Sequence, residues 1–161
     1  MLNQLHLAML ELYKGDAKRI QHFCKVHSYA KLIAECEKVD KQTLFILEAA
    51  ALTHDIGIHL CEEKYGDCSG KLQEKEGPAI AARLLGELGF EKQVSERVQY
   101  LIAHHHTYDN IDEIDYQILV EADFLVNIME DGLSKDAALK AYHNIFKTPC
   151  GKRMCREMFN I

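Results

Sequence analysis

The sequence predicts an all-α protein. Apolar residues recur at helical spacing along nearly the whole chain, and no segment shows the sustained alternation or the β-branched richness of a strand. The length of 161 residues fits one domain with one hydrophobic core. We find no internal repeat, linker or low-complexity tract, so we expect a single helical domain over residues 1–161.

Three helices are predicted in the first third of the chain. Apolar positions within residues 2–12 form one amphipathic stripe, which Gly15 ends. Asp16 can cap a second helix that runs to about Glu37. From about Thr43 the segment LFILEAAALTH is apolar nearly all round, which is typical of a helix buried on every side. We expect this third helix to be the centre of the fold.

A long connection is predicted next. The segment CEEKYGDCSGKLQEKEGP, residues 61–78, is polar and contains glycine, so we expect either a lid or substrate loop or a disordered surface loop. Pro78 suits the first turn of a helix that continues to Leu88. The remaining helices are indicated by apolar stripes at residues 94–101 and 119–126, by the N-cap candidate Ser134, and by a Met-rich segment near the end.

Composition excludes some classes of function. The net charge of −6 and the absence of a Lys/Arg cluster argue against a nucleic-acid surface. We see no uninterrupted apolar run of membrane-spanning length and no basic start or cleavage site of a signal peptide, so we expect no membrane partner and a cytoplasmic location. Six cysteines without a CxxC pair favour reduced thiols. The sequence leaves the oligomeric state open.

Several predicted helices direct an ionisable side chain towards the core. His22 precedes Val26 on the apolar face by four residues, and Asp123 follows Leu119 by four. His54 and Asp55 close the apolar third helix. Burying such groups costs several kcal/mol unless a partner compensates them.

A further pair, His104 and His105, continues the stripe of residues 94–101. Imidazoles and carboxylates that converge from facing helices form metal sites in helical bundles, because a divalent cation compensates the desolvated ligands. The alternative is a bundle in which the inward His and Asp side chains only hydrogen-bond one another. We favour the metal site.

Four segments carry a family resemblance. In their order, RIQHFCKVHSYA, ALTHDIG, LIAHHHTYDN and EADFLVN resemble the HD superfamily of metal-dependent phosphohydrolases, over about residues 19–130. The resemblance implies a helical bundle of the HD-domain type with a metal site in its core. It implies that a first metal ion is bound by His22, His54, Asp55 and Asp123. His27 is the second choice for the first of these ligands.

A second metal ion is a further implication of the resemblance. Members with two ions add a His between the HD pair and the paired His, and here the pair corresponds to His104 and His105, with His106 outward or in a supporting place. No His lies in KLQEKEGPAIAARLL, so Glu76 is the substitute we expect, with Asp55 bridging both ions. One or two divalent ions are therefore expected, and Fe, Mn, Zn, Ni and Mg are not distinguished.

The function implied is hydrolysis of a small phosphoester, with a nucleotide preferred, by a metal-activated water. His54 and Asp55 are the expected catalytic residues, and the substrate contacts we expect are Arg19, Lys75 and Asn127. Ile58 replaces the Lys that often follows HDIG in cyclic-dinucleotide-degrading relatives, and their GYP segment is absent, which excludes that activity. The alternatives are a di-iron oxygenase-type enzyme on the same fold and a non-catalytic nucleotide or metal sensor.

Overall fold

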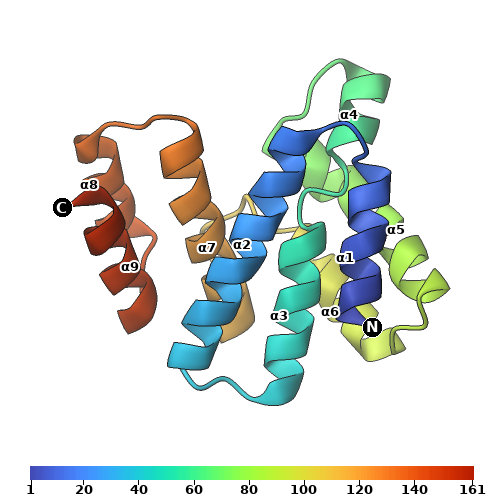
Figure 1. Cartoon of the computed structure of the whole chain (residues 1–161), viewed down its shortest axis with the longest axis horizontal. Coiled ribbons are helices and arrows are strands. Elements are labelled where there is room, and N and C mark those ends of the chain that lie inside the picture. Colours follow the sequence, from blue (N-terminus) through green and yellow to red (C-terminus); the bar gives the residue numbers. More distant parts are fainter.

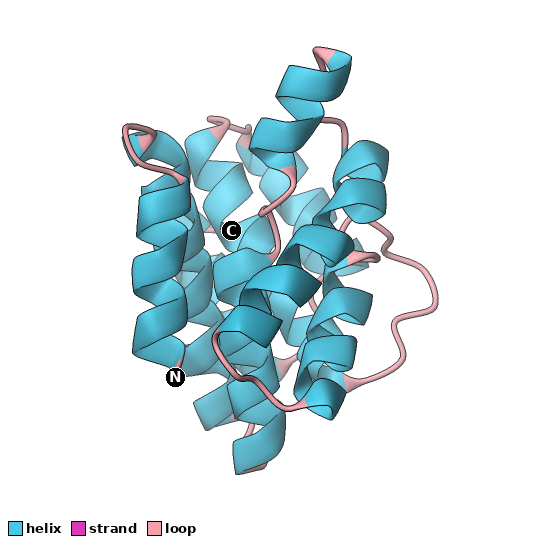
Figure 2. Ribbon diagram, turned by 90° about the vertical axis from the view of Figure 1, so that its right-hand side faces the viewer, coloured by secondary structure: helices cyan, strands magenta, loops and turns pink.

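A computed structural model describes all 161 residues and contains helices joined by turns, with no strand (Figures 1 and 2). The predicted all-α class is therefore confirmed. The helices are, in order, α1 (Leu2–Leu12), α2 (Ala17–Cys36), α3 (Lys41–Thr53), α4 (Ile58–Tyr65), α5 (Gly70–Glu87), α6 (Lys92–Ile102), α7 (Ile114–Glu130), α8 (Lys135–Asn144) and α9 (Pro149–Phe159).

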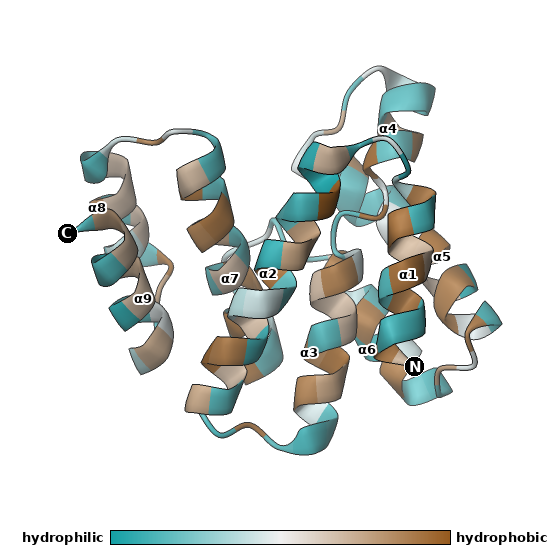
Figure 3. Cartoon of the chain, in the orientation of Figure 1, coloured by the Kyte–Doolittle hydropathy of each residue, from teal (hydrophilic) through white to brown (hydrophobic).

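The core is one cluster of 33 buried apolar residues, to which α2, α3 and α7 contribute large shares. Every residue of α3 from Ile46 to Thr53 is buried, as its apolar circumference predicts. The stretch Lys41–Tyr65 is long and apolar enough to cross a membrane by length and composition, but 72% of its most apolar window is buried inside the fold. In Figure 3 the turn between α2 and α3 is mostly hydrophilic, with one hydrophobic stretch, whereas the helices carry both hydrophobic and hydrophilic residues.

Side-chain caps place the starts of several helices. The Asp16 carboxylate accepts a hydrogen bond from the Arg19 amide, and the Ser134 hydroxyl accepts one from the Ala137 amide. Both predicted caps are therefore confirmed. Asp40 caps α3 in the same way by accepting from the amides of residues 42 and 43. These caps set where α2 and α3 begin, and α3 ends at the HD pair.

The prediction of a long loop over residues 61–78 is wrong. Residues 58–65 form α4, and α5 begins at Gly70, so only a short turn separates the two helices. Pro78 lies inside α5 rather than in its first turn. Polar, glycine-bearing composition indicated a loop, but packing overrode this local preference, as it commonly does.

The packing that stabilises α5 is a close crossing of two glycines. A Cβ added to Gly57, in the turn after the HD pair, would lie 3.1 Å from the Cα of Gly77 on α5. A Cβ on Gly77 would lie 2.8 Å from a methyl group of Ile102. The small residues let the backbone of α5 pass directly over the HD turn, which brings one face of α5 to the end of α3.

The α8–α9 pair lies at one end of the molecule, beyond α7 (Figure 1). It is anchored by Glu121 of α7, a fully buried carboxylate. Glu121 accepts hydrogen bonds from the amides of Lys147 and Thr148, from the Thr148 hydroxyl and from the Gln117 carboxamide. The acid in EADFLVN that lies two residues before Asp123 is thus a structural anchor rather than part of the metal centre.

Candidate metal centre

Three buried side chains from three different elements meet at the centre of the molecule. The ligand atoms of His22 on α2, His54 at the end of α3 and Asp123 on α7 all lie within 4.8 Å of one another. The Nε2 atom of His22 is 3.3 Å from Nε2 of His54 and 3.1 Å from Oδ1 of Asp123. The predicted convergence of these residues is present in the structure.

The outer nitrogen of each imidazole is held by an acceptor. Nδ1 of His22 donates to the Glu130 carboxylate at 2.9 Å, and Nδ1 of His54 donates to the Ala51 carbonyl at 2.9 Å. A hydrogen on Nδ1 leaves the lone pair of a neutral imidazole on Nε2. Both Nε2 atoms therefore face the shared centre with the geometry that metal-ligating histidines adopt.

Asp55 joins this group to a second one. Its Oδ2 atom lies 3.5 Å from Nε2 of His22, and its Oδ1 atom lies 3.5 Å from Nε2 of both His54 and His105. The backbone carbonyl of Asp55 accepts a hydrogen bond from the buried Tyr13 hydroxyl at 2.7 Å, which ties the HD turn to the end of α1. The two carboxylate oxygens thus face two neighbouring positions.

The second group consists of Asp55, His105 and His106, whose ligand atoms also lie within 4.8 Å of one another. Nδ1 of His105 donates to the Ile102 carbonyl at 2.7 Å, so its lone pair lies on Nε2. The Nε2 atoms of His105 and His106 are both buried without a hydrogen-bond partner. Such orphaned nitrogens are unusual in a folded protein and suit a cation.

His104 does not join the site, which corrects its predicted role. Helix α6 ends at Ile102, and the following turn directs His104 towards Tyr100, whose carbonyl accepts its Nδ1 hydrogen at 2.7 Å. The two rings lie with centroids 4.2 Å apart. His106, expected outward or in a supporting place, lies with Asp55 and His105 instead. The helical stripe could not predict this exchange because helical periodicity stops where the helix ends.

Glu76 and Lys75 also lie apart from the site. The Glu76 carboxylate accepts from the Lys64 ammonium at 3.1 Å and from the Tyr65 hydroxyl, at the surface between α4 and α5. Lys75 is exposed beside Glu76, at 3.9 Å, and does not line the pocket described below. Both predicted roles are therefore corrected: residues 75 and 76 are on the outer faces of α5, whereas Gln73 and Gly77, one turn apart, share the inner face.

His27, the second choice for the first ligand, is occupied elsewhere. Its Nε2 atom lies 2.9 Å from the Glu48 carboxylate, which is also 3.5 Å from the Lys31 ammonium. His27 and His22 are five residues apart and therefore point to different sides of α2. The preference for His22 agrees with the geometry.

The electrostatics of the cluster show that it needs positive charge. Burial alone would raise the pKa of Asp123 and of Asp55, but neighbouring imidazoles outweigh burial and hold both values well below the usual range. Burial would lower the pKa of His22, but the hydrogen bond to Asp123 and the charge of Asp55 raise it to about 9. For His106, burial and the neighbouring His105 lower the pKa to about 4. The ionised forms of both carboxylates are thus favoured here, and they favour positive charge at the centre, which a divalent cation can supply.

A solvent-open pocket of about 370 Å³ leads to these residues. His22, Asp55, Asp123 and His106 line it together with the predicted substrate contacts Arg19 and Asn127. The Arg19 guanidinium is already paired with Asp16 at 2.8 Å and with Glu62 at 2.5 Å.

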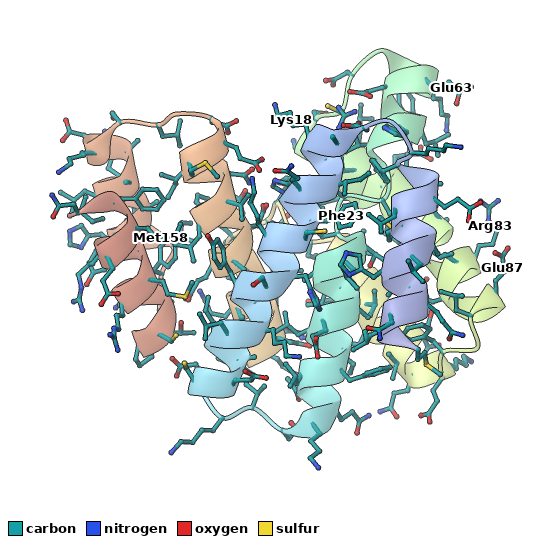
Figure 4. All side chains as sticks on the ribbon, viewed as in Figure 1. Lys18, Phe23, Glu63, Arg83, Glu87 and Met158 are labelled. Carbon is teal, nitrogen blue, oxygen red and sulfur yellow. The ribbon has the colours of Figure 1, made fainter.

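Lys18 is a second cation at this pocket and was not predicted. Figure 4 shows it at the first turn of α2. Its adjacency to Arg19 was the only signal in the sequence. Lys18 is exposed and makes no ion pair, so its charge is available to a ligand.

The donor set fits a divalent metal ion. Imidazole nitrogens with fixed tautomers and carboxylates from facing helices are the ligands that bundles use for Zn, Fe, Mn or Ni. The two orphaned imidazole nitrogens are the independent sign that the histidines were not arranged to bind one another. Two adjacent groups that share Asp55 can hold one ion or two.

Comparison with known proteins agrees with this geometry. The family model of the HD domain matches residues 19–140. A crystal structure of a predicted HD superfamily hydrolase from an uncultured Thermotogales bacterium is 25% identical, with a TM-score of 0.71 over 98% of this chain and 84% of that chain. No curated protein matches. Because the domain match spans most of the chain and includes all four expected first-ion ligands, this protein belongs to the HD-domain family.

Proposed function

We propose that the protein is a metal-dependent phosphohydrolase that acts on a small phosphoester, with a nucleotide as the preferred class. The HD domain and the hydrolase-like structural neighbour support a metal-dependent hydrolase in general. The observation that carries the finer proposal is that His22, Asp55 and Asp123 line a solvent-open pocket with two cationic side chains, Lys18 and Arg19, beside them.

A divalent ion bound there would lower the pKa of a bound water and withdraw charge from a phosphoryl oxygen. The residues of the chain have separate tasks. His22, His54 and Asp123 would hold the ion, while Glu130 and the Ala51 carbonyl keep the imidazoles in the ligating tautomer. Asp55, with 18% of its side chain exposed, is the carboxylate that can face both the ion and the substrate.

Substrate recognition would occur at the pocket mouth. Lys18 has a free ammonium that can pair with a phosphate oxygen. Arg19 contributes less direct charge because Asp16 and Glu62 already neutralise it. The Asn127 carboxamide, which lines the same pocket, can hydrogen-bond a sugar or base oxygen. The pocket volume of about 370 Å³ is of the size that takes a mononucleotide-sized ligand.

The test is release of phosphate or of a nucleotide from a panel of nucleoside monophosphates, dinucleotides and sugar phosphates, with Mn²⁺, Fe²⁺, Zn²⁺, Ni²⁺ or Mg²⁺ supplied to metal-stripped protein. Asp55→Asn should abolish turnover, and chelator should do the same. His104→Ala is the matched control, because this histidine adjoins His105 but faces Tyr100, and it should retain turnover. If the loaded protein releases neither phosphate nor a nucleotide from any compound yet consumes O₂ with iron bound, the di-iron alternative replaces the proposal. Metal binding without either activity would favour the sensor.

The remaining expectations are part of the same proposal. The substrate is a small phosphorylated molecule, and neither nucleic acid nor membrane is a partner. The net charge of −6 supports the first exclusion, and the buried position of the most apolar stretch supports the second. Six free thiols support a cytoplasmic location. One contiguous core supports a single domain.

A further inference from the structure

Three buried side-chain atoms in the molecule lack a hydrogen-bond partner: Oε1 of Gln73, Nε2 of His105 and Nε2 of His106. His105 and His106 belong to the second group around Asp55. Gln73 lines the same pocket as Asp55 and His106. Buried polar groups are nearly always paired, and Gln73 shares the pocket with two members of the group around Asp55, so the three unpaired atoms indicate a shared partner.

The orientation of the Gln73 carboxamide is determined by its other end. Its Nε2 atom donates to the Cys68 carbonyl at 2.7 Å. A reversed amide would place two acceptor oxygens against each other, so Oε1 is the unpaired atom. With 6% of its surface exposed, Gln73 presents an acceptor that neither protein nor bulk solvent satisfies.

The backbone explains why this particular residue reaches the site. Gln73 lies four residues before Gly77, on the face of α5 that crosses Gly57 at the HD turn. One turn earlier, Gly70 leaves room for the His106 ring, which a Cβ would approach to 2.7 Å. Gln73 is thus held between the crossing and His106 and cannot turn to the surface without breaking its bond to Cys68.

We propose that the carboxamide oxygen of Gln73 is a ligand for a divalent cation held by Asp55, His105 and His106. This inference rests on the proposed metal-dependent function. A neutral carbonyl oxygen suits Mn²⁺ or Mg²⁺ better than Zn²⁺, which favours nitrogen and sulfur. The position bounded by Gln73 is therefore the weaker of two positions and prefers Mn²⁺, whereas His22, His54 and Asp123 supply the stronger one.

The test measures metal binding without substrate. Metal-stripped wild-type protein, Gln73→Met and Gln73→His are titrated calorimetrically with Mn²⁺ and with Zn²⁺, and each Mn²⁺-loaded sample is measured by electron paramagnetic resonance for coupling between two ions. Methionine keeps the length and burial of the side chain but offers no hard oxygen. Glu76→Gln is the matched control, because Glu76 lies three residues away on the outer face of the same helix.

Wild type and Glu76→Gln should bind two Mn²⁺ ions with a coupled spectrum. Gln73→Met should lower the affinity for the second Mn²⁺ ion at least tenfold and leave the affinity for the first unchanged. Gln73→His should raise the affinity for the second Zn²⁺ ion at least tenfold. Both changes are on the scale expected at a metal site. Circular dichroism verifies the fold of each variant.

Two Mn²⁺ ions bound by Gln73→Met with wild-type affinity would overturn the proposal, as would a wild type that binds one Mn²⁺ ion. The first result would mean that the partner of the Gln73 carboxamide oxygen is a water or a substrate hydroxyl rather than the metal ion. Absence of phosphate or nucleotide release from a protein carrying two ions would refute the proposed function alone and leave this assignment intact.

Discussion

Nδ1 of His22 donates a hydrogen bond to Oε2 of Glu130 at 2.9 Å, so α2 and α7 are joined directly behind the candidate metal centre. Glu130 is also paired with Lys25 at 2.9 Å. Because this contact fixes the ring and its tautomer, Glu130→Ala should lower the affinity for the first metal ion by about 10- to 100-fold, the usual range for a partner of a metal-ligating histidine.

Calorimetric titration of stripped protein measures this effect. Glu157→Ala, which removes an exposed carboxylate paired with Arg153 on α9, is the control and should bind metal as wild type does. Equal affinities for the two variants would show that Glu130 has no influence on His22.

His22 and His27 lie on the same helix but differ in what they contact. His22→Ala should strip the protein of metal, because it removes a nitrogen that faces His54 and Asp123. His27→Ala should keep the metal, since only its pairing with Glu48 is lost. Elemental analysis of both purified variants measures the bound metal. Loss of metal from His27→Ala alone would show that His27, and not His22, is the first ligand.

Substitution by alanine should have different effects at two glycines of α5, weakening metal binding at one and raising stability at the other. Gly70→Ala places a Cβ 2.7 Å from the His106 ring and should displace it, weakening the second Mn²⁺ while the first still binds. Gly86→Ala meets no atom within 4 Å and should raise the free energy of unfolding by about 0.5–1 kcal/mol, because alanine is the better helix former.

Metal titration and urea unfolding of both variants provide the readouts. Unchanged binding of the second Mn²⁺ in Gly70→Ala would mean that the position of His106 does not matter to that ion.

Glu121 should be among the residues most costly to remove from the fold. In Glu121→Ala the amides of Lys147 and Thr148 lose a buried acceptor, so we expect the free energy of unfolding to fall by about 2–4 kcal/mol. Urea denaturation measures the loss. The exposed substitution Glu157→Ala should stay within about 0.5 kcal/mol of wild type. A comparably small effect at Glu121 would contradict its anchoring of the α8–α9 pair.

Arg97 links α6 to the start of α7 and lowers the pKa of a neighbouring carboxyl group. Its guanidinium hydrogen bonds lower the pKa of Asp112 below the ordinary value of 3.8. The resulting stabilisation is present above pH 3.8 and is lost as the pH falls through the lower, folded-state pKa. In Arg97→Gln the pKa of Asp112 should rise towards its ordinary value, as NMR titration of the carboxyl carbon would show. An unchanged Asp112 titration would contradict the pairing.

Several features of this protein followed from local physics and could be read from the sequence. Asp16 and Ser134 cap their helices through contacts within three residues, so the signal and the structure are equally local. The inward direction of His22 and Asp123 follows from a helical period that continues unbroken through α2 and α7. The order of the HD motifs then associated these residues with Asp55.

Other features depended on contacts between distant segments. His106 rather than His104 lies at the site because α6 ends before these residues, so helical periodicity does not set their directions. The space that Gly70 leaves on α5 then admits the His106 ring. The choice of Gln73 over Glu76 depended on the crossing of Gly57 and Gly77, which determines the rotation of α5 about its axis. Composition suggested a loop there because a polar, glycine-bearing segment has weak intrinsic helicity. Tertiary packing supplied the free energy that made it a helix and turned one of its polar side chains inward.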